Sequence, residues 1–381
     1  MLVNTEVSIV GLETDQITID AAGAASPVFN ISDGEPGFLN VWISDLKITG
    51  SSAYAAIFNG EDLILDSVTV YGNSRGINNS GGSLTLSNST VSGNSIQGIS
   101  SEYSGISILD SVIANNGTAA MPSSGGGLFI DASNVTIERS TISHNIAEKG
   151  GGILFQSSVY VDDSLTIIDS TISGNEATAG PGGGIYANAS NIYGASSTTT
   201  VTNSTISGNI SSNEVGGLYR RGQYVSLENT TITENSAQTG GGIQIDYEFY
   251  GGANYGSLQA SNTIIAGNTL TGGGDSDVEG SLSFTNSVHN LIGDVATAGG
   301  LIDDPTGTGN QVGVDPLLSG LGNYGGPTKT HALLVGSPAL DAGDQNLLPV
   351  VMYDQRGTSF NRVFDGQIDI GAYEANPNTA E

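Results

Sequence analysis

The stretch Ser-Thr-Ile-Ser-Gly-Asn occupies residues 170–175 and returns unchanged at residues 204–209. Variants of it recur along most of the chain, and each ends in an asparagine that lies 21 to 34 residues from the next. A recurring phrase with an uneven period of this size is typical of a solenoid, in which successive coils share a core and differ in their loops. The closing asparagines are Asn73, Asn94, Asn116, Asn145, Asn175, Asn209, Asn235 and Asn268.

Each coil contains three short stretches of alternating apolar and polar residues, rich in β-branched side chains, as expected of strands with one buried face. We name the three predicted sheets A, B and C. Sheet A contains stretches such as residues 165–167, sheet B the Thr-Ile-Ser of the phrase, and sheet C a stretch after a glycine run, such as residues 184–186. No stretch has a sustained helical period. The sequence therefore predicts an all-β fold, a right-handed three-sheet parallel β-helix of about ten coils and about 50 Å in length.

The composition limits the partners of the protein. The chain carries 38 acidic and 9 basic residues, a net charge of −29, so we exclude nucleic acid and anionic membranes as partners. It has no cysteine for disulfides, and no apolar run is long enough for membrane insertion of this segment. We expect a monomeric rod that is stabilised by the stacking of its coils.

The closing asparagines have a structural explanation. A tight corner between two sheets often needs a left-handed backbone, which asparagine tolerates better than most residues. Stacked asparagine amides also form hydrogen bonds from coil to coil in other stacked-strand structures. We therefore assign Asn94, Asn145, Asn175, Asn209 and Asn235 to the scaffold and not to catalysis.

Two parts of the chain resemble known families. The succession of Ser-Gly-Asn, a small residue and Gly-Gly-Gly-Ile within residues 40–295 resembles the repeats of polymorphic outer membrane proteins. The end module of choice-of-anchor Q proteins is similar to four motifs of this chain: Gly-Gly-Pro-Thr-Lys-Thr-His at 325–331, Ser-Pro-Ala-Leu-Asp-Ala-Gly-Asp at 337–344, Asp-Gln-Arg-Gly at 354–357 and Asp-Ile-Gly-Ala-Tyr-Glu at 369–374. The resemblance implies an extracellular or cell-surface bacterial β-helix, part of a larger secreted protein with an anchoring signal. It brings no catalytic residue set.

The C-terminal block also has a physical explanation. We expect coils in residues 1–300, and in residues 301–381 the last coil and a cap of the same domain. Such a cap would cover the strand edges and the apolar cross-section at the end of the solenoid. Trp42 and Phe38, near the other end, are expected in the core or in a cap rather than in a sugar-binding platform. Within the C-terminal cap, Arg356 is expected to pair with one of three carboxylates: Asp341, Asp365 or Asp369.

Sheet C gives the strongest indication of a binding site. If the residue after each glycine run points inward, its successor points outward, which gives the row Phe129, Leu154, Tyr186, Tyr219 and Gln244. The loops that follow sheet C leave adjacent coils at one corner, so their tyrosines and carboxylates should form a glycan groove. An alternative is that longer loops fold down and the tyrosines merely pack there. The predicted ligand-binding residues are Tyr186, Tyr219, Tyr224, Tyr247, Tyr250 and Tyr255.

The same groove would hold the active site if the protein were a polysaccharide lyase or a glycoside hydrolase. A hydrolase needs two carboxylates that flank the glycosidic bond. The chain lacks the clustered aspartates with Gly-His-Gly and Arg-x-Lys of polygalacturonase-like enzymes, and its three histidines are scattered. A non-catalytic role is therefore favoured, and for the enzyme alternative the candidate catalytic residues are Asp162, Asp163, Arg220, Arg221, Asp246 and Glu248.

A loop at residues 272–279 places oxygen ligands close together, as hard cations require. Asp275, Asp277 and Glu279 are therefore candidate Ca²⁺ ligands. No other cofactor is predicted.

The exposed side of sheet B suggests a further alternative. Pairs such as Thr171 with Ser173 and Thr205 with Ser207 would form a regular array of hydroxyl and methyl groups, which resembles the faces of β-helical ice-binding proteins. The simpler explanation is that threonine and serine suit an exposed strand face. The function favoured by the sequence is an adhesive module that binds a neutral or cation-bridged glycan.

Overall fold

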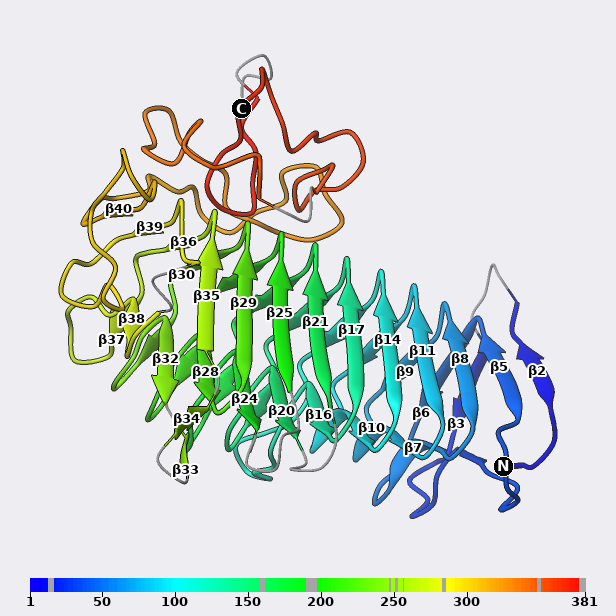
Figure 1. Ribbon diagram of the computed structural model, residues 1–381. Coiled ribbons are helices and arrows are strands. Elements are labelled where there is room, and N and C mark those ends of the chain that lie inside the picture. The colour runs from blue at the N-terminus through cyan, green and yellow to red at the C-terminus, as the bar shows by residue number, and fades with distance from the viewer. Residues whose placement is uncertain are drawn as a thin grey trace.

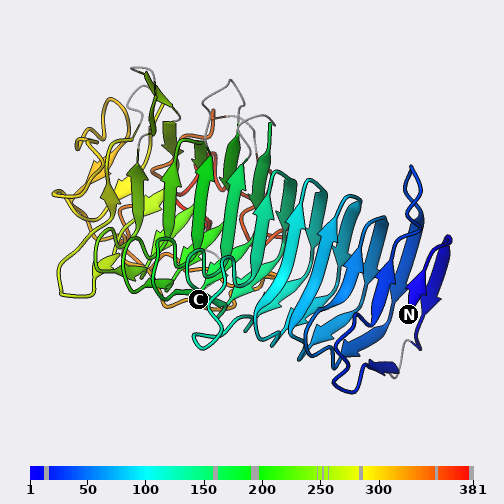
Figure 2. The ribbon, with the colours of Figure 1, turned by 90° about the horizontal axis from the view of Figure 1, so that it is seen from below.

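The computed structural model is a rod of stacked coils, and successive strands of each sheet follow one another along it (Figures 1 and 2). All strand pairs within the stacked sheets are parallel, which confirms the predicted three-sheet parallel β-helix. The part of the chain that the structure describes contains no helix of the length and apolarity needed to cross a membrane. The described residues are 1–12, 17–157, 162–189, 197–246, 248–250, 253–255, 257–282, 286–347 and 351–376, with no side chains described for 189, 248–250 and 253–255.

The three sheets run along the length of the rod. Sheet A consists of β2 (Val7–Val10), β5 (Asn40–Ser44), β8 (Asp62–Asp66), β11 (Ser83–Ser87), β14 (Gly105–Leu109), β17 (Asn134–Glu138), β21 (Ser164–Ile168), β25 (Thr198–Thr202), β29 (Tyr224–Glu228) and β35 (Ser257–Ser261). Sheet B consists of β3 (Ile17–Asp20), β6 (Leu46–Thr49), β9 (Thr69–Tyr71), β12 (Thr90–Ser92), β15 (Val112–Ala114), β18 (Thr141–Ser143), β22 (Thr171–Ser173), β26 (Thr205–Ser207), β30 (Thr231–Thr233), β36 (Ile264–Ile265), β39 (Leu291–Ile292) and β40 (Gln311–Val312). Sheet C consists of β1 (Leu2–Val3), β4 (Phe29–Ile31), β7 (Ala55–Asn59), β10 (Arg75–Ser80), β13 (Gln97–Glu102), β16 (Leu128–Asp131), β20 (Ile153–Ser157), β24 (Ile185–Ala189), β28 (Leu218–Arg221), β32 (Ile243–Asp246) and β38 (Val278–Glu279).

Two further sheets were not predicted. A short parallel sheet forms in the turns between sheets B and C from the sixth of these turns onward, and an antiparallel hairpin follows β32. The short sheet consists of β19 (Ile146–Ala147), β23 (Glu176–Ala177), β27 (Ile210–Ser211), β31 (Ser236–Ala237) and β37 (Thr269–Leu270), and the hairpin of β33 (Glu248–Tyr250) and β34 (Ala253–Tyr255).

The core is a set of aligned apolar columns inside the coils. Ile142, Ile172 and Ile206 of sheet B are in register with one another and are fully buried. The predicted inward residues of sheet C, from Leu128 to Ile243, are buried in the same core. Burying one such side chain contributes about 1.5–3 kcal/mol, so the stacked columns supply most of the driving force for folding.

The closing asparagines form a buried ladder along the rod. From Asn73 to Asn268, each Nδ2 donates to the Oδ1 of the next coil at 2.8–3.1 Å. The same Oδ1 accepts a second bond from the backbone N–H of the preceding coil's asparagine, as at Asn145 and Asn175. The ladder ends where Asn268 donates to the carboxylate of Asp277 at 3.0 Å. The predicted structural role of these asparagines is confirmed.

The prediction that the ladder asparagines have a left-handed backbone is wrong, because the left-handed residue is the one before each of them. Positive φ falls on the residue before each asparagine, such as Gly174 (62°), Gly208 (65°), His144 (54°) and Glu234 (58°). The preceding residue turns the corner, and this leaves the asparagine side chain buried beneath it and aligned with its neighbours. His144 has a positive φ at this position, although glycine adopts such a conformation most easily.

The last strand pair of sheet B, β39 with β40, lies at the end of the rod, as expected of a last coil after residue 300. The later part of the C-terminal region packs against the flank of the rod and not over its end, where the sequence predicts a cap. Residues within 328–347 and 351–372 contact the outer side of β22, β26 and β30. Figure 1 shows this region beside the rod and not beyond its end. The Oγ1 of Thr205 is 2.9 Å from the Oγ1 of Thr330 and donates to the Oε1 of Gln355 at 2.6 Å. Thr231 accepts a bond from the backbone N–H of Ala372 at 3.0 Å. The hydroxyl groups of the Thr-Ile-Ser strands thus form hydrogen bonds with the C-terminal region, which lies beside them without regular strands of its own here.

This packing contradicts the ice-binding alternative. Thr171, Thr205 and Thr231 are buried beneath the C-terminal region, together with Ser207. The Oγ of Ser207 is 2.8 Å from the Nε2 of His331, which is itself buried. The regular hydroxyl array is therefore an internal interface over these coils and not a surface that meets water.

The pairing predicted for Arg356 is also wrong. Its guanidinium pairs with the carboxylate of Asp354 at 2.6 Å and donates to the backbone carbonyl of Glu374 at 2.6 Å. The rings of Phe360 and Tyr373 lie on it at 3.9 and 3.8 Å from centroid to Cζ. Asp354 is two residues away, so the turn itself brings the ion pair together without help from the more distant carboxylates.

Replacing one ladder asparagine tests the role of the ladder. Asn175→Ala should lower the free energy of unfolding by about 3 kcal/mol, because it leaves the buried Nδ2 and N–H groups of Asn145 without an acceptor. Thr166→Ala, on the outer face of the same coil, should change it by less than about 0.5 kcal/mol. Guanidinium unfolding of both variants measures this, and equal midpoints for Asn175→Ala and the parent would contradict it.

The pH dependence of the C-terminal region follows from Glu374. Burial is the main cause that raises the pKa of this carboxyl from 4.5 to about 9, with Asp369 adding to the shift. The folded state thus favours the protonated form, so its contribution to stability is complete below pH 4.5 and is lost as pH rises toward about 9. Thermal melting should show a smaller loss across this pH range in Glu374→Gln than in the parent. Parallel pH profiles would contradict the assignment.

Candidate functional site

The predicted outward row of sheet C is in register but is covered. Tyr186 and Tyr219 are paired across β24 and β28, and their rings stack with centroids 5.1 Å apart and an interplanar angle of 7°. Both are buried, in a cluster with Leu154 and Val215. The glycine-rich turns press on this row: a Cβ at Gly182 would lie 2.9 Å from the Cβ of Tyr186. The prediction of an open groove is therefore wrong for Tyr186 and Tyr219, and the packing alternative describes them.

Tyr219 is also held by a carboxylate. Its hydroxyl donates to the Oδ2 of Asp246 at 2.7 Å. Burial and this bond raise the pKa of Tyr219 well above its ordinary value, so the phenol stays protonated. Tyr219 and Asp246 thus form a hydrogen-bonded pair that fixes the end of β28 against β32.

Two of the candidate catalytic residues are buried. Arg220 is fully buried in an inward column with Ala187 and Ile245, and its Nε donates to the backbone carbonyl of Gln223 at 2.7 Å. Asp163 is buried as well, at the corner where the chain enters β21. Arg220 has no open surface where a polymer could reach it, so its assignment to a surface active site is wrong. Asp163 does not lie in a groove on sheet C; it lines a hollow on the outer side of sheet A, with 2% of its surface exposed.

The other predicted residues whose side chains the structure describes lie on different faces of the rod. Asp162 and Arg221 are exposed, and Tyr224 is 46% exposed on the outer face of sheet A, around the corner from sheet C. Tyr247 lies outside the described residues. The side chains of Glu248, Tyr250 and Tyr255 are likewise outside the described part of the structure, and their backbones form the hairpin of β33 and β34.

The candidate Ca²⁺ ligands are not brought together. Asp277 is buried at the end of the asparagine ladder, where its Oδ2 also accepts a bond from the N–H of Asp294 at 2.8 Å. Asp275 is exposed and Glu279 is half-buried. Within the described ranges, no three His, Asp or Glu side chains form a group that could hold a metal ion. Burial raises the pKa of Asp277, and the hydrogen bonds of the ladder oppose this shift.

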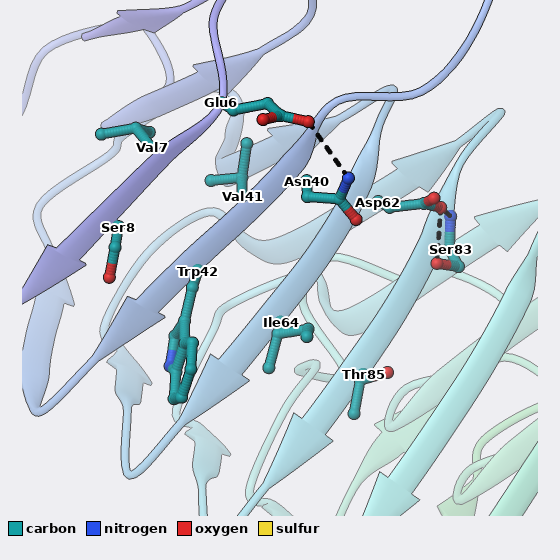
Figure 3. A pocket seen from close by; sticks show the side chains of 10 residues that line it. All are labelled: Glu6, Val7, Ser8, Asn40, Val41, Trp42, Asp62, Ile64, Ser83 and Thr85. Carbon is teal, nitrogen blue, oxygen red and sulfur yellow. Dashed lines mark hydrogen bonds between the residues drawn. The ribbon is translucent and has the colours of Figure 1, made fainter.

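The open surface of the rod lies on sheet A, near the N-terminus. A hollow of about 550 Å³ runs across the outer face of β2, β5, β8 and β11 (Figure 3). Trp42, the single tryptophan of the chain, stands on this face with 50% of its surface exposed, between Ser8 and Ile64 in the same row. The residues that line the hollow are Glu6, Val7, Ser8, Asn40, Val41, Trp42, Asp62, Ile64, Ser83 and Thr85.

Polar groups lie along one side of this hollow, in the row that opens each strand. The Nδ2 of Asn40 donates to the Oε1 of Glu6 at 3.3 Å, and the Oγ of Ser83 donates to the Oδ1 of Asp62 at 2.6 Å. Figure 3 shows these side chains above the apolar row of Trp42 and Ile64. An aromatic ring beside carboxylate, amide and hydroxyl groups on rigid strands can bind a polyhydroxylated ligand.

The hollow continues toward later coils. A second hollow of about 430 Å³ shares Asp62 and Ser83 with the first, and Asn134 of β17 lies at its wall. Two exposed aromatic residues line it, Phe38 at 56% and Tyr103 at 66%. We call the two connected hollows the Trp42 groove.

The expectation that Trp42 and Phe38 belong to the core or to a cap is wrong. Val41 and Ile43 point inward and are buried, so the alternation of β5 directs Trp42 outward. The sequence of residues 40–44 contains this signal, because Trp42 alternates with the apolar residues Val41 and Ile43 in the period-2 pattern of the other strands. Phe38 precedes β5 in an exposed turn.

Comparisons with known proteins concern the fold. A family model described as a right handed beta helix region matches residues 54–212, and no curated protein matches the chain. Among solved structures, the chain is similar to the crystal structure of pectate lyase Pel9A, with 14% sequence identity, a TM-score of 0.46, and coverage of 98% of this chain and 87% of that chain. The resemblance to choice-of-anchor Q proteins and to polymorphic outer membrane proteins stays a prediction. The family match and the sheet topology together show that the chain folds as a right-handed parallel β-helix.

Proposed function

We propose that this protein is an extracellular or cell-surface module that binds a neutral glycan without cleaving it, and that the Trp42 groove is its binding surface. The observation that carries the proposal is the half-exposed indole of Trp42 on a rigid strand, within a hollow lined by polar side chains. Aromatic faces of this kind are large and rigid, so they lose little conformational entropy when a ligand covers them.

The accessibility of the three sheets supports the choice of this face. Sheet C is covered by glycine-rich turns over its later coils, and sheet B by the C-terminal region. The middle row of sheet A, by contrast, stays partly or fully exposed from Ser8 to Gln259. A long polymer would therefore meet sheet A along the whole rod.

The charges in the groove favour a neutral ligand. Glu6 and Asp62 place two carboxylates at its edge, and the protein carries a net charge of −29. A polyanionic glycan would be repelled unless cations bridged it. A non-catalytic role is supported by the full burial of Arg220 inside the coil. Asp163 lines the second hollow of the groove, but with 2% of its surface exposed it offers a ligand almost no accessible carboxylate.

Substitution of Trp42 tests the proposal. Trp42→Ala should weaken binding of a neutral oligosaccharide by about 2 kcal/mol, or about thirtyfold, because it removes the aromatic contact. Tyr224→Ala removes an exposed ring from the same sheet, outside the groove, and should bind as the parent does. Calorimetric titration with gluco-, xylo- and manno-oligosaccharides measures the affinities. Because the chain has one tryptophan, its fluorescence reports directly on the groove in the parent. If none of these oligosaccharides binds the parent, or if Trp42→Ala and Tyr224→Ala lose the same affinity, the proposal is rejected.

The continuity of the two hollows predicts a dependence on ligand length. Longer oligosaccharides should bind more tightly than disaccharides, since they extend from Trp42 toward Phe38 and Tyr103. Tyr103→Ala should weaken binding of the long ligands and leave the disaccharide affinity unchanged. The same titrations decide this, and the appearance of new reducing ends during incubation would contradict the non-catalytic role.

A further inference from the structure

A second hollow of distinct chemistry lies on sheet C, where the glycine-rich turns begin. In the coil that contains β13, only residues 95–96 separate the ladder residue Asn94 from sheet C. In the next coil residues 117–127 intervene. Ser123 and Ser124 of this turn form one wall of an open hollow of about 310 Å³.

The outward row of sheet C supplies the floor of this hollow. Asn78, Ser100 and Phe129 are paired from strand to strand in one row. Gln97 closes the wall, because its Nε2 donates to the backbone carbonyls of Ser124 and Gly125 at 2.9 and 3.1 Å. The residues around the hollow are Arg75, Asn78, Ile96, Gln97, Ser100, Glu102, Ser123, Ser124 and Phe129.

Arg75 distinguishes this hollow from the Trp42 groove. It is half-buried, and its guanidinium makes no hydrogen bond or ion pair with the described residues. Arg139, Arg356 and Arg362, by contrast, donate to carboxylate or amide oxygens. In a chain with nine basic residues and 38 acidic ones, an arginine without a carboxylate partner inside a hollow is a feature that the fold does not require.

A second polar atom in the hollow also lacks a partner. The Oδ1 of Asn78 is buried and accepts no hydrogen bond from the described residues. A buried acceptor left in this way is unfavourable, and a turn of the amide toward the hollow would let a ligand hydroxyl group donate to it. The Cα atoms of Arg75 and Asn78 lie three residues apart on β10, about 10 Å along the strand, so a ligand that satisfies both side chains needs two different polar groups.

We propose that this hollow binds one sugar-sized ring that carries a single carboxylate. Arg75 would receive the carboxylate through its planar fork of N–H groups, and the Oδ1 of Asn78 would accept a bond from a ring hydroxyl. Phe129 forms the apolar part of the lining. Glu102 lies at the opposite end of the strands from Arg75, so a second carboxylate on the ligand would be repelled. The volume lies at the small end of the range of ligand pockets, which indicates one ring and not a polymer.

Titration with glucuronate and with glucose tests this site. The parent should bind glucuronate at millimolar concentration and bind glucose at least about tenfold more weakly, since the charge-assisted bonds to Arg75 are then missing. Arg75→Gln should lose the preference for glucuronate, and Arg75→Lys should keep part of it. Arg221→Ala removes the same charge from an exposed position of sheet C, and its binding should equal that of the parent.

The outcomes separate this site from the Trp42 groove. Trp42→Ala should leave the affinity for glucuronate unchanged, and Arg75→Gln should leave the affinity for neutral oligosaccharides unchanged. Equal affinities for glucuronate and glucose, the same loss in Arg75→Gln and Arg221→Ala, or no glucuronate binding by a parent that melts cooperatively would each overturn the proposal.

Discussion

The structure depends on hydrogen bonds between buried asparagine side chains of successive coils. Each amide has two donors and an acceptor that must be satisfied away from water, and the neighbouring coils satisfy them at distances of 2.8–3.1 Å. This requirement fixes the position of one residue per coil with respect to the next. The strands on either side of the ladder then fall into register, and their isoleucine, valine and leucine columns close the core.

The outer faces differ because different segments cover them. Sheet C carries aromatic residues where turns press on it, and sheet B carries hydroxyl groups where the C-terminal region packs on it. Tyr186, Tyr219 and Thr205, which the sequence predicts on binding surfaces, are thus buried in contacts within the protein. The Trp42 groove begins in the first coils, where neither cover is present, and the hollow beside Arg75 lies on sheet C at the edge of the first long turn.

The features of the fold that the sequence predicts are those that depend on local periodicity. The alternation of apolar and polar residues identified the strands, the inward columns and the outward row, because these depend on neighbours within a few positions. The destination of the C-terminal region depends on contacts such as the one between Thr205 and Gln355, which are 150 residues apart and have no shared period. The burial of Arg220 likewise depends on the backbone carbonyl of Gln223 at a corner of the coil. The outward orientation of Trp42 was predictable from the alternation of β5. The expectation that it is buried came from the general tendency of a single tryptophan to lie in a core or a cap.

The ladder also determines how such a rod can change in length during evolution. Successive ladder residues are separated by as few as 21 and as many as 34 residues, yet the bond between them is the same. A loop can therefore lengthen between two asparagines without disturbing its neighbours, since each coil contacts chiefly the coils next to it. Duplication or loss of a whole coil, from one ladder asparagine to the next, would preserve every stacking interaction except those at the junction. Gene-level changes in coil number would therefore alter the reach of the rod and leave its cross-section the same.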